Sequence, residues 1–261
     1  MKSNHSATKR IVVLNEAAAG PEERDFVLHV EDHFAHEGTT IYRSRNQIKK
    51  VRDLNVKRYG LPNIVNRYLY DRLRLSKAER AYRNALRLTE LGVPTALPFG
   101  YVLHKKRGAL LESYLVTAHL PLTRTMYEFG HVTRKEDASE VLRAFALFTA
   151  TLHEKGVLHL DYSPGNILFD RKEDGSYAFA IVDVNRLLFS DKPIPIREGL
   201  RNMRRLWGER DELALIARSY ATARGADEGE AERTLLEAHA AFWGKRDTRW
   251  IHELPAEEDK A

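Results

Sequence analysis

The segment 159–169 contains residues whose types and spacing could perform chemistry: it includes Asp161 and, five positions later, Asn166. Asp183 follows Asn166 by seventeen positions and ends an apolar run. A carboxylate such as that of Asp161 can orient a hydroxyl group and accept its proton. Amide and carboxylate oxygens, such as those of Asn166 and Asp183, are the hard ligands that Mg²⁺ prefers. The pattern therefore indicates activation of a hydroxyl group beside a bound magnesium ion.

This spacing is that of a kinase catalytic loop, His-x-Asp-x-x-x-x-Asn, followed further on by a metal-binding Asp. The sequence predicts Asp161 as the catalytic residue, with Asn166 and Asp183 as ligands of a Mg²⁺ that bridges the phosphates of ATP. His159 is expected to pack and to hold the loop by hydrogen bonds rather than to act as a base. In the alternative interpretation, Asp161 and Asn166 only cap a turn and Asp183 only caps a strand end.

A kinase also needs a cation that holds the nucleotide phosphates. Residues 54–59 are β-prone, and alternation along that strand points Lys57 to the face opposite its two neighbours. Lys57 is therefore the predicted phosphate anchor. Lys49 and Lys50, on the preceding strand, are the alternatives.

The chain before the catalytic loop is predicted to be rich in strands. Apolar residues over 26–36 have helical spacing, and β-prone runs follow from residue 38 to residue 118. One helix interrupts these strands: it begins at Ser76, with Glu79 three positions later, which is the pattern of a capping box.

The second half of the chain is predicted to be mainly helical. The predicted elements are an amphipathic helix over 137–154, strands over 167–169 and 177–182, and a mostly helical tail from residue 198. Together the two halves predict an α+β fold of two lobes, an N-terminal lobe of residues 1–118 and a C-terminal lobe of residues 119–261.

Composition and charge exclude several classes of protein. The chain has 261 residues and no cysteine, which excludes a disulfide scaffold, a thiolate metal site and a cysteine nucleophile. Its apolar runs are too short for a transmembrane helix or a secretory signal, so a cytoplasmic protein is expected. Residues 43–87 contain 14 Lys or Arg against three acidic residues, an excess that attracts polyanions such as phosphates, nucleic acid or a membrane surface.

A second basic stretch, 197–207, combines four arginines with three aliphatic or Met residues and Trp207. A basic amphipathic segment with a tryptophan suits a membrane interface. The interpretation that we favour is a helix of the C-terminal core with an exposed basic face.

Several segments together resemble the lipopolysaccharide kinase family, the Kdo/heptose kinases of Gram-negative bacteria, within the protein-kinase-like superfamily. The segments are 38–46, 55–59, 76–85, 91–95, 159–169 and 182–186. The resemblance implies a two-lobed protein-kinase-like fold. It also implies ATP- and Mg²⁺-dependent transfer of phosphate to a sugar hydroxyl, of Kdo or heptose, in the inner core of lipopolysaccharide.

The resemblance further implies an anionic glycolipid acceptor, lipid A-core, at the cytoplasmic face of the inner membrane. The basic segment 43–87 suits such an acceptor, so peripheral contact with that membrane is expected and a nucleic-acid partner is not. Glu79 is the candidate partner of the phosphate-anchoring lysine, unless it serves only the capping box. Arg45, in a turn without glycines, is the candidate for additional positive charge toward the nucleotide phosphates.

Three alternatives stay open at this stage. The chain could be another small-molecule kinase, of the aminoglycoside or choline kinase type, or a RIO-type kinase that acts on protein or ribosome. It could also be a pseudokinase or binding module, although none of the residues that such proteins lose is missing here. No Ala-Pro-Glu sequence follows Asp183, which argues against a platform for peptide substrates.

Overall fold

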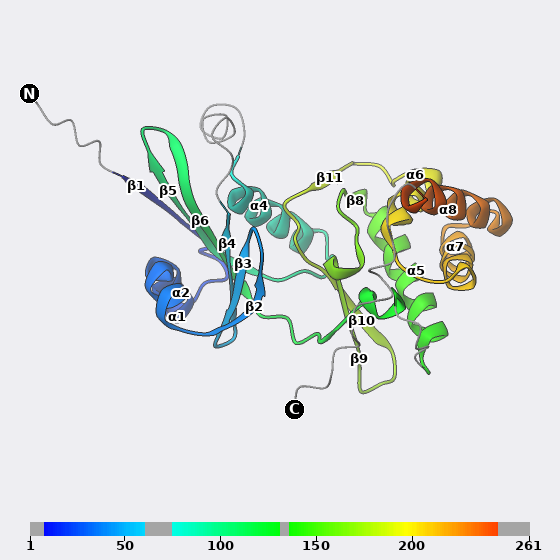
Figure 1. Ribbon diagram of the computed structural model, residues 1–261, viewed down its shortest axis with the longest axis horizontal. Coiled ribbons are helices and arrows are strands. Elements are labelled where there is room, and N and C mark those ends of the chain that lie inside the picture. Colours follow the sequence, from blue (N-terminus) through cyan, green and yellow to red (C-terminus); the bar gives the residue numbers. More distant parts are fainter. Residues whose placement is uncertain (1–7, 61–74, 131–135, 245–261) are drawn as a thin grey trace, which may run out of the picture. The chain divides into compact units, whose positions relative to one another are not determined.

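The structure is a computed structural model that describes residues 8–60, 75–130 and 136–244 (Figure 1). Contacts between residues divide the chain into two compact units. The first unit comprises Met1–Pro121 and Asp183–Asn185, and the second comprises Leu122–Val182 and Arg186–Ala261. Among the helices of the described residues, none has the length and apolar character needed to cross a membrane.

The first unit is built on a six-stranded antiparallel sheet with the strand order β1-β5-β6-β4-β3-β2 (Figure 1). Alternation along β4 places Val56 in the apolar core on one face of the sheet and Tyr59 in the core on the other face. The strands are β1 (Lys9–Leu14), β2 (Thr39–Arg43), β3 (Gln47–Val51), β4 (Leu54–Tyr59), β5 (Pro98–Lys106) and β6 (Ala109–Ala118).

Two short helices, α1 (Pro21–Leu28) and α2 (Val30–His36), cover one face of this sheet (Figure 1). They bury Phe26 and Phe34 in a core that they share with β4 and β6. The backbone leaves the helical conformation at His29, where φ is −119° and ψ is 24°. The helical spacing over 26–36 therefore forms two helices rather than one.

A longer helix, α4 (Lys77–Glu90), covers the other face of the sheet (Figure 1). It buries Tyr82 against Tyr101 of β5, with ring centroids 5.2 Å apart. The helix begins where the sequence predicts it, because the Ser76 hydroxyl accepts a hydrogen bond of 3.1 Å from the backbone N–H of Glu79.

The second unit is mainly helical and contains two small antiparallel sheets (Figure 1). α5 (Ala138–Glu154), the amphipathic helix predicted over 137–154, buries Val141, Phe145 and Leu152 and packs against α7. The other helices are α6 (Ile196–Asn202), α7 (Arg210–Arg224), α8 (Glu228–Trp243) and the 3₁₀ turns η1 (Met126–Gly130), η2 (Pro164–Asn166) and η3 (Met203–Arg205). One sheet contains β7 (Arg124–Thr125), β9 (Ile167–Arg171) and β10 (Tyr177–Ile181), and the other contains β8 (Val157–His159) and β11 (Leu187–Phe189).

The apolar residues of the basic stretch 197–207 belong to the core of the second unit. Leu200, Met203, Leu206 and Trp207 are each at most 5% exposed. The side chains that would have to enter a membrane interface are thus already buried within the protein, as the favoured interpretation of this stretch expects.

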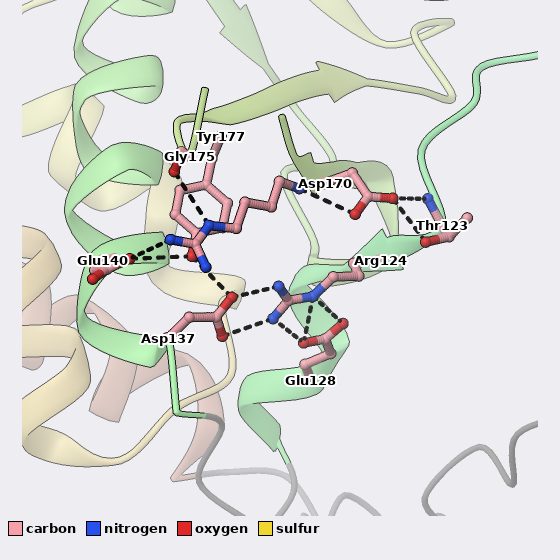
Figure 2. Close-up of polar contacts among 9 residues, drawn as sticks. Thr123, Arg124, Glu128, Asp137, Glu140, Asp170, Gly175 and Tyr177 are labelled. Carbon is pink, nitrogen blue, oxygen red and sulfur yellow. Dashed lines mark hydrogen bonds and ion pairs between the residues drawn. The ribbon is translucent and has the colours of Figure 1, made fainter. Parts of the chain in front are cut away.

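An ion-pair network fixes η1 in the second unit, as Figure 2 shows. Arg124 donates to the carboxylates of Glu128, at 2.8 Å, and Asp137, at 3.0 Å. These two partners raise the pKa of Arg124 above its usual value, and the hydrogen bonds from Arg124 hold the pKa of Asp137 below its usual value. The guanidinium also lies over the ring of Phe169 in β9, 4.6 Å from its centroid.

Candidate active site

The predicted catalytic loop runs from β8 through η2 into β9, all within the second unit. His159, at the end of β8, is fully buried. Its Nε2 lies 3.1 Å from the carbonyl oxygen of Val182, and its Nδ1 accepts a hydrogen bond of 3.1 Å from the backbone N–H of Asp161. Because Nδ1 accepts a hydrogen bond, the ring proton lies on Nε2, which donates a hydrogen bond to the carbonyl oxygen of Val182. His159 therefore holds the loop, as the sequence analysis expects.

Asn166 closes the other end of the loop. Its amide nitrogen donates a hydrogen bond of 2.9 Å to the backbone carbonyl of Asp161, which fixes the separation of the two predicted site residues. Its own carbonyl accepts a hydrogen bond of 3.0 Å from the N–H of Val182, the residue before Asp183. Since only the nitrogen of the Asn166 amide can donate, the oxygen of that side chain is the atom available to a cation.

The side chain of Asp161 has a partner that the sequence analysis does not identify. Its Oδ1 accepts a hydrogen bond from Nη1 of Arg205, at the end of η3. The Arg205 guanidinium also lies over the ring of Phe242, 5.3 Å from its centroid. Both side chains of the ion pair stay partly accessible, Asp161 at 33% and Arg205 at 30%.

An aromatic residue of η1 packs against the same loop. A Cβ atom at Gly165 would lie 2.3 Å from the ring of Tyr127, so only glycine allows this approach. The Tyr127 ring also contacts Trp207, with centroids 4.5 Å apart. Tyr127 nevertheless remains 41% exposed beside the loop.

In the first unit, Lys57 of β4 forms an ion pair with Asp183: Nζ lies 2.8 Å from Oδ1. Asp183 has a left-handed backbone conformation, with φ of 54°. Its Oδ1 also accepts a hydrogen bond from Nδ2 of Asn185. From α4, Asn84 donates a hydrogen bond of 2.6 Å to the carbonyl of Val184. The short segment 183–185 is thus held by the sheet and by α4.

Several positive charges of the first unit act on Lys77. Burial lowers the pKa of Lys77, the first residue of α4, and the positive charges of Arg45, Arg80 and Lys57 lower it further, whereas the charge of Asp183 raises it. These four cations, which we call the phosphate cluster, all belong to the first unit. Their combined charge suits a polyanion such as the phosphates of a nucleotide.

The structure does not bring Glu79 to Lys57. The Glu79 carboxylate instead pairs with Arg83, one helical turn further along α4, at 2.8 Å. Arg45 is exposed in the turn between β2 and β3. That turn rests on Gly60, where a Cβ would lie 2.0 Å from the carbonyl oxygen of Arg45. Of the two additional nucleotide-binding candidates, Arg45 thus lies in the phosphate cluster and Glu79 has a different partner.

Comparisons with known proteins decide the family. A family model described as the lipopolysaccharide kinase (Kdo/WaaP) family matches residues 30–217, a range that includes all of the predicted site residues. The chain belongs to this family. No curated protein matches the sequence.

Solved structures that are similar to this chain have a kinase-like fold. WaaP in complex with acyl carrier protein matches with a TM-score of 0.59 and 19% sequence identity, over 92% of this chain and 99% of that chain. APH(2″)-IIa in a ternary complex with streptomycin and ATP matches with a TM-score of 0.50 and 10% identity, over 86% of this chain and 88% of that one. The predicted family and the predicted two-lobed α+β class are confirmed.

Kinases of this fold family use a magnesium ion. The side chains predicted as its ligands in this chain have the oxygen atoms that such an ion prefers. In the described part of the chain, no group of three or more His, Cys, Asp or Glu residues could hold a metal by itself. The amide oxygen of Asn166 and the carboxylate of Asp183 are hard oxygen donors. Mg²⁺ commonly binds to one or two such side chains and completes its coordination with substrate phosphates and water.

A groove between α6 and α8 has a volume of about 270 Å³. Its lining residues are Arg197, Arg201, Thr234, Glu237, Ala238 and Ala241. None of the predicted site residues lines it, so the groove does not enter the chemistry of the lipopolysaccharide kinase site.

Proposed function

We propose that the protein transfers the γ-phosphate of ATP, in a Mg²⁺-dependent reaction, to a sugar hydroxyl of the lipopolysaccharide inner core. Membership of the lipopolysaccharide kinase family makes the chain a phosphotransferase. The observation that carries the finer proposal is the predicted catalytic loop, in which the Asn166 side chain donates to the backbone carbonyl of Asp161 and His159 contacts the backbone of both Asp161 and Val182. We take residues 1–118 and 119–261 as its two lobes.

The phosphate cluster is proposed to bind the nucleotide. Lys57 is the anchor of the phosphates, and Lys77, Arg80 and Arg45 add charge around them. The ion pair with Asp183 orients the side chain of Lys57. Glu79 acts here through the fold of α4, because its carboxylate is engaged by Arg83.

The chemical step is proposed to need one proton acceptor. Asp161 orients the acceptor hydroxyl and takes its proton while a new bond forms between the hydroxyl oxygen and the γ-phosphorus. The bond between this phosphorus and the bridging oxygen breaks, and ADP leaves. A Mg²⁺ ion held by Asn166 and Asp183 would offset the negative charge on the phosphates.

The proposed acceptor is an anionic glycolipid, lipid A-core, and the basic segment 43–87 favours association with an anionic membrane surface at the cytoplasmic face of the inner membrane. No nucleic-acid partner is proposed. A protein partner is a second candidate, because the similar WaaP structure is a complex with acyl carrier protein.

Phosphate transfer from ATP to Kdo-lipid A, followed by mass spectrometry of the lipid, tests the proposal. We expect the lipid to gain one phosphate, in a reaction that requires Mg²⁺ and that Asp161→Asn abolishes. Asp174→Asn is the matched control, because Asp174 only caps the exposed turn between β9 and β10. Transfer to an aminoglycoside or choline instead, or ATP turnover that RNA stimulates, would favour the other kinase types. Absence of ATP binding would leave a pseudokinase.

A further inference from the structure

Arg205 is the one arginine of the stretch 197–207 that, in the described part of the chain, forms an ion pair with a residue of the catalytic loop. Arg204, its neighbour, donates instead to the backbone carbonyl of Arg201, at 2.9 Å. Both guanidinium groups lie over the ring of Phe242. The pairing with Asp161 is therefore specific to one of two adjacent arginines in similar surroundings.

The ion pair constrains how an acceptor can approach Asp161. An acceptor hydroxyl must donate its proton to this carboxylate, and the guanidinium of Arg205 already occupies one of the carboxylate oxygens. A hydroxyl that reaches the carboxylate therefore carries the neighbouring groups of its sugar against Arg205. A guanidinium offers a planar fork of donors that matches a carboxylate or phosphate with two charge-assisted hydrogen bonds, whereas a neutral hydroxyl accepts only one weaker hydrogen bond from it.

Arg205 is also held in position for a second anion. Stacking over Phe242 fixes the plane of its guanidinium, and its Nε atom is buried without a hydrogen-bond partner. The Phe242 ring, the carboxylate of Asp161 and the burial of Nε thus restrict the orientation of the guanidinium. The side chain as a whole is still 30% exposed, so part of its donor edge can reach a ligand in solvent.

Tyr127 offers an apolar surface beside the same loop. Its ring lies against Gly165 and Trp207, which restricts its rotation, and it is 41% exposed. Aromatic rings in such positions present a flat, rigid contact surface at low entropic cost. The C–H face of a sugar ring is a suitable partner for such a surface.

We infer that Arg205 and Tyr127 form the acceptor subsite and that they select an acidic sugar. The anionic group of the sugar binds the guanidinium of Arg205, which then shares its charge between this group and Asp161. This sharing weakens the ion pair between Arg205 and Asp161 when an acceptor with a suitable anion binds, and Asp161 can then take the hydroxyl proton. This inference rests on the proposed function and, between the two candidate sugars, selects Kdo, which carries a carboxylate, over neutral heptose.

Kinetics with matched acceptors test the subsite. The acceptors are Kdo-lipid A and the same lipid with its Kdo carboxyl groups converted to methyl esters, which keeps every hydroxyl. For the wild type we expect KM to rise on the order of ten- to a hundredfold on esterification, the size of one lost charged hydrogen-bond pair. Arg205→Gln should raise KM for the acid form by a similar factor, leave KM for the ester nearly unchanged, and leave KM for ATP unchanged. Arg204→Gln is the matched control and should behave as the wild type.

Two further measurements keep the test decisive. Arg205→Lys retains a charge beside Asp161 without the planar fork, so it should show an intermediate KM for the acid acceptor. Binding of free Kdo, followed by ligand-observed NMR, should be lost in Arg205→Gln and weakened in Tyr127→Ala, and it needs no catalysis. Failure of phosphate transfer with intact Kdo binding would contradict the proposed function alone. Equal losses of kcat toward both acceptors in Arg205→Gln, or Kdo binding that survives this substitution, would overturn the inference.

Discussion

Nζ of Lys57 lies 2.8 Å from Oδ1 of Asp183, a contact between two residues that are 126 positions apart in the chain. The lysine is only 14% exposed, so its charge is partly removed from water. An ion pair in such surroundings is held more firmly than one at the surface. The first unit thereby holds the predicted phosphate anchor and the predicted metal ligand together.

Substitution of Lys57 should impair both the binding of the nucleotide phosphates and the positioning of the Asp183 carboxylate. We expect Lys57→Met to reduce kcat/KM for ATP on the order of a hundredfold, because a phosphate-binding charge is lost and the carboxylate of Asp183 loses its partner. Steady-state kinetics at several ATP concentrations give the value. Lys106→Met, at the exposed end of the β5–β6 hairpin, is the control. A loss confined to KM of the lipid acceptor would contradict the assignment of Lys57.

Lys77 should contribute to nucleotide binding through its charge. Its pKa is lowered by burial and by three nearby cations, so a bound polyphosphate should relieve the repulsion and raise that pKa again. We predict that Lys77→Met weakens ATP binding about tenfold, and that wild-type ATP binding is accompanied by proton uptake above neutral pH. Calorimetry in buffers of different ionisation enthalpy measures both effects. Proton release on binding would contradict the prediction.

The candidate site could be predicted where its residues are close in sequence. Asp161 and Asn166 lie on one short loop, and the helix before it and the strands after it have clear periodicity. A pairing of Glu79 with Lys57, in contrast, would depend on tertiary geometry, whereas the partner that Glu79 has is local. Once α4 forms, Arg83 is four positions away on the same helical face, a spacing at which a carboxylate finds a cation locally.

Arg205 shows why the rest of the site could not be predicted. It lies 44 positions from Asp161, in a stretch whose arginines are equivalent by charge and period. Both Arg204 and Arg205 lie over Phe242 of α8, and it is the local backbone of η3 that gives Arg205 the ion pair with the loop and Arg204 a contact with the carbonyl of Arg201. The phosphate cluster is similar, because the role that we propose for Lys77 and Arg80 depends on charges that are distant in the sequence, such as Arg45 and Lys57. The sequence shows only a local excess of positive charge, and this excess does not indicate which Lys or Arg residues lie together in the fold.

The network around Arg124 should stabilise the second unit (Figure 2). Arg124 is about one-fifth exposed and pairs with two carboxylates, so Arg124→Met leaves Glu128 and Asp137 without their cation. We expect the free energy of unfolding to fall by about 2–4 kcal/mol, measured by urea denaturation. Arg171→Met is the control, because Arg171 is 58% exposed and lies 3.9 Å from its carboxylate partner Glu140; its effect should stay below about 1 kcal/mol. Equal effects of the two substitutions would contradict this role of Arg124.

A buried histidine should make the second unit sensitive to acid. His153, at the end of α5, is fully buried, and its Nδ1 lies 3.0 Å from the hydroxyl of Tyr220. Its Nε2 lies 3.4 Å from the amide oxygen of Asn202, and Asn202 in turn donates to the carbonyl of His159 at 2.9 Å. A chain of polar contacts thus connects His153 to the catalytic loop. The nearby charge of Arg224 also disfavours a second proton on this ring.

Burial lowers the pKa of His153 from 6.5 to about 4. The unfolded chain therefore binds a proton at this position between about pH 6.5 and pH 4, while the folded chain does not. The contribution of neutral His153 is complete above the unfolded pKa and is lost as the pH falls, by up to about 3 kcal/mol. We expect urea denaturation from pH 7 to pH 4 to show this decrease, and His153→Gln, which keeps hydrogen-bonding groups but does not titrate, to have a flatter pH profile. His29→Gln changes an exposed histidine and should keep the wild-type profile; a profile that His153→Gln leaves equally steep would assign the acid sensitivity to other groups.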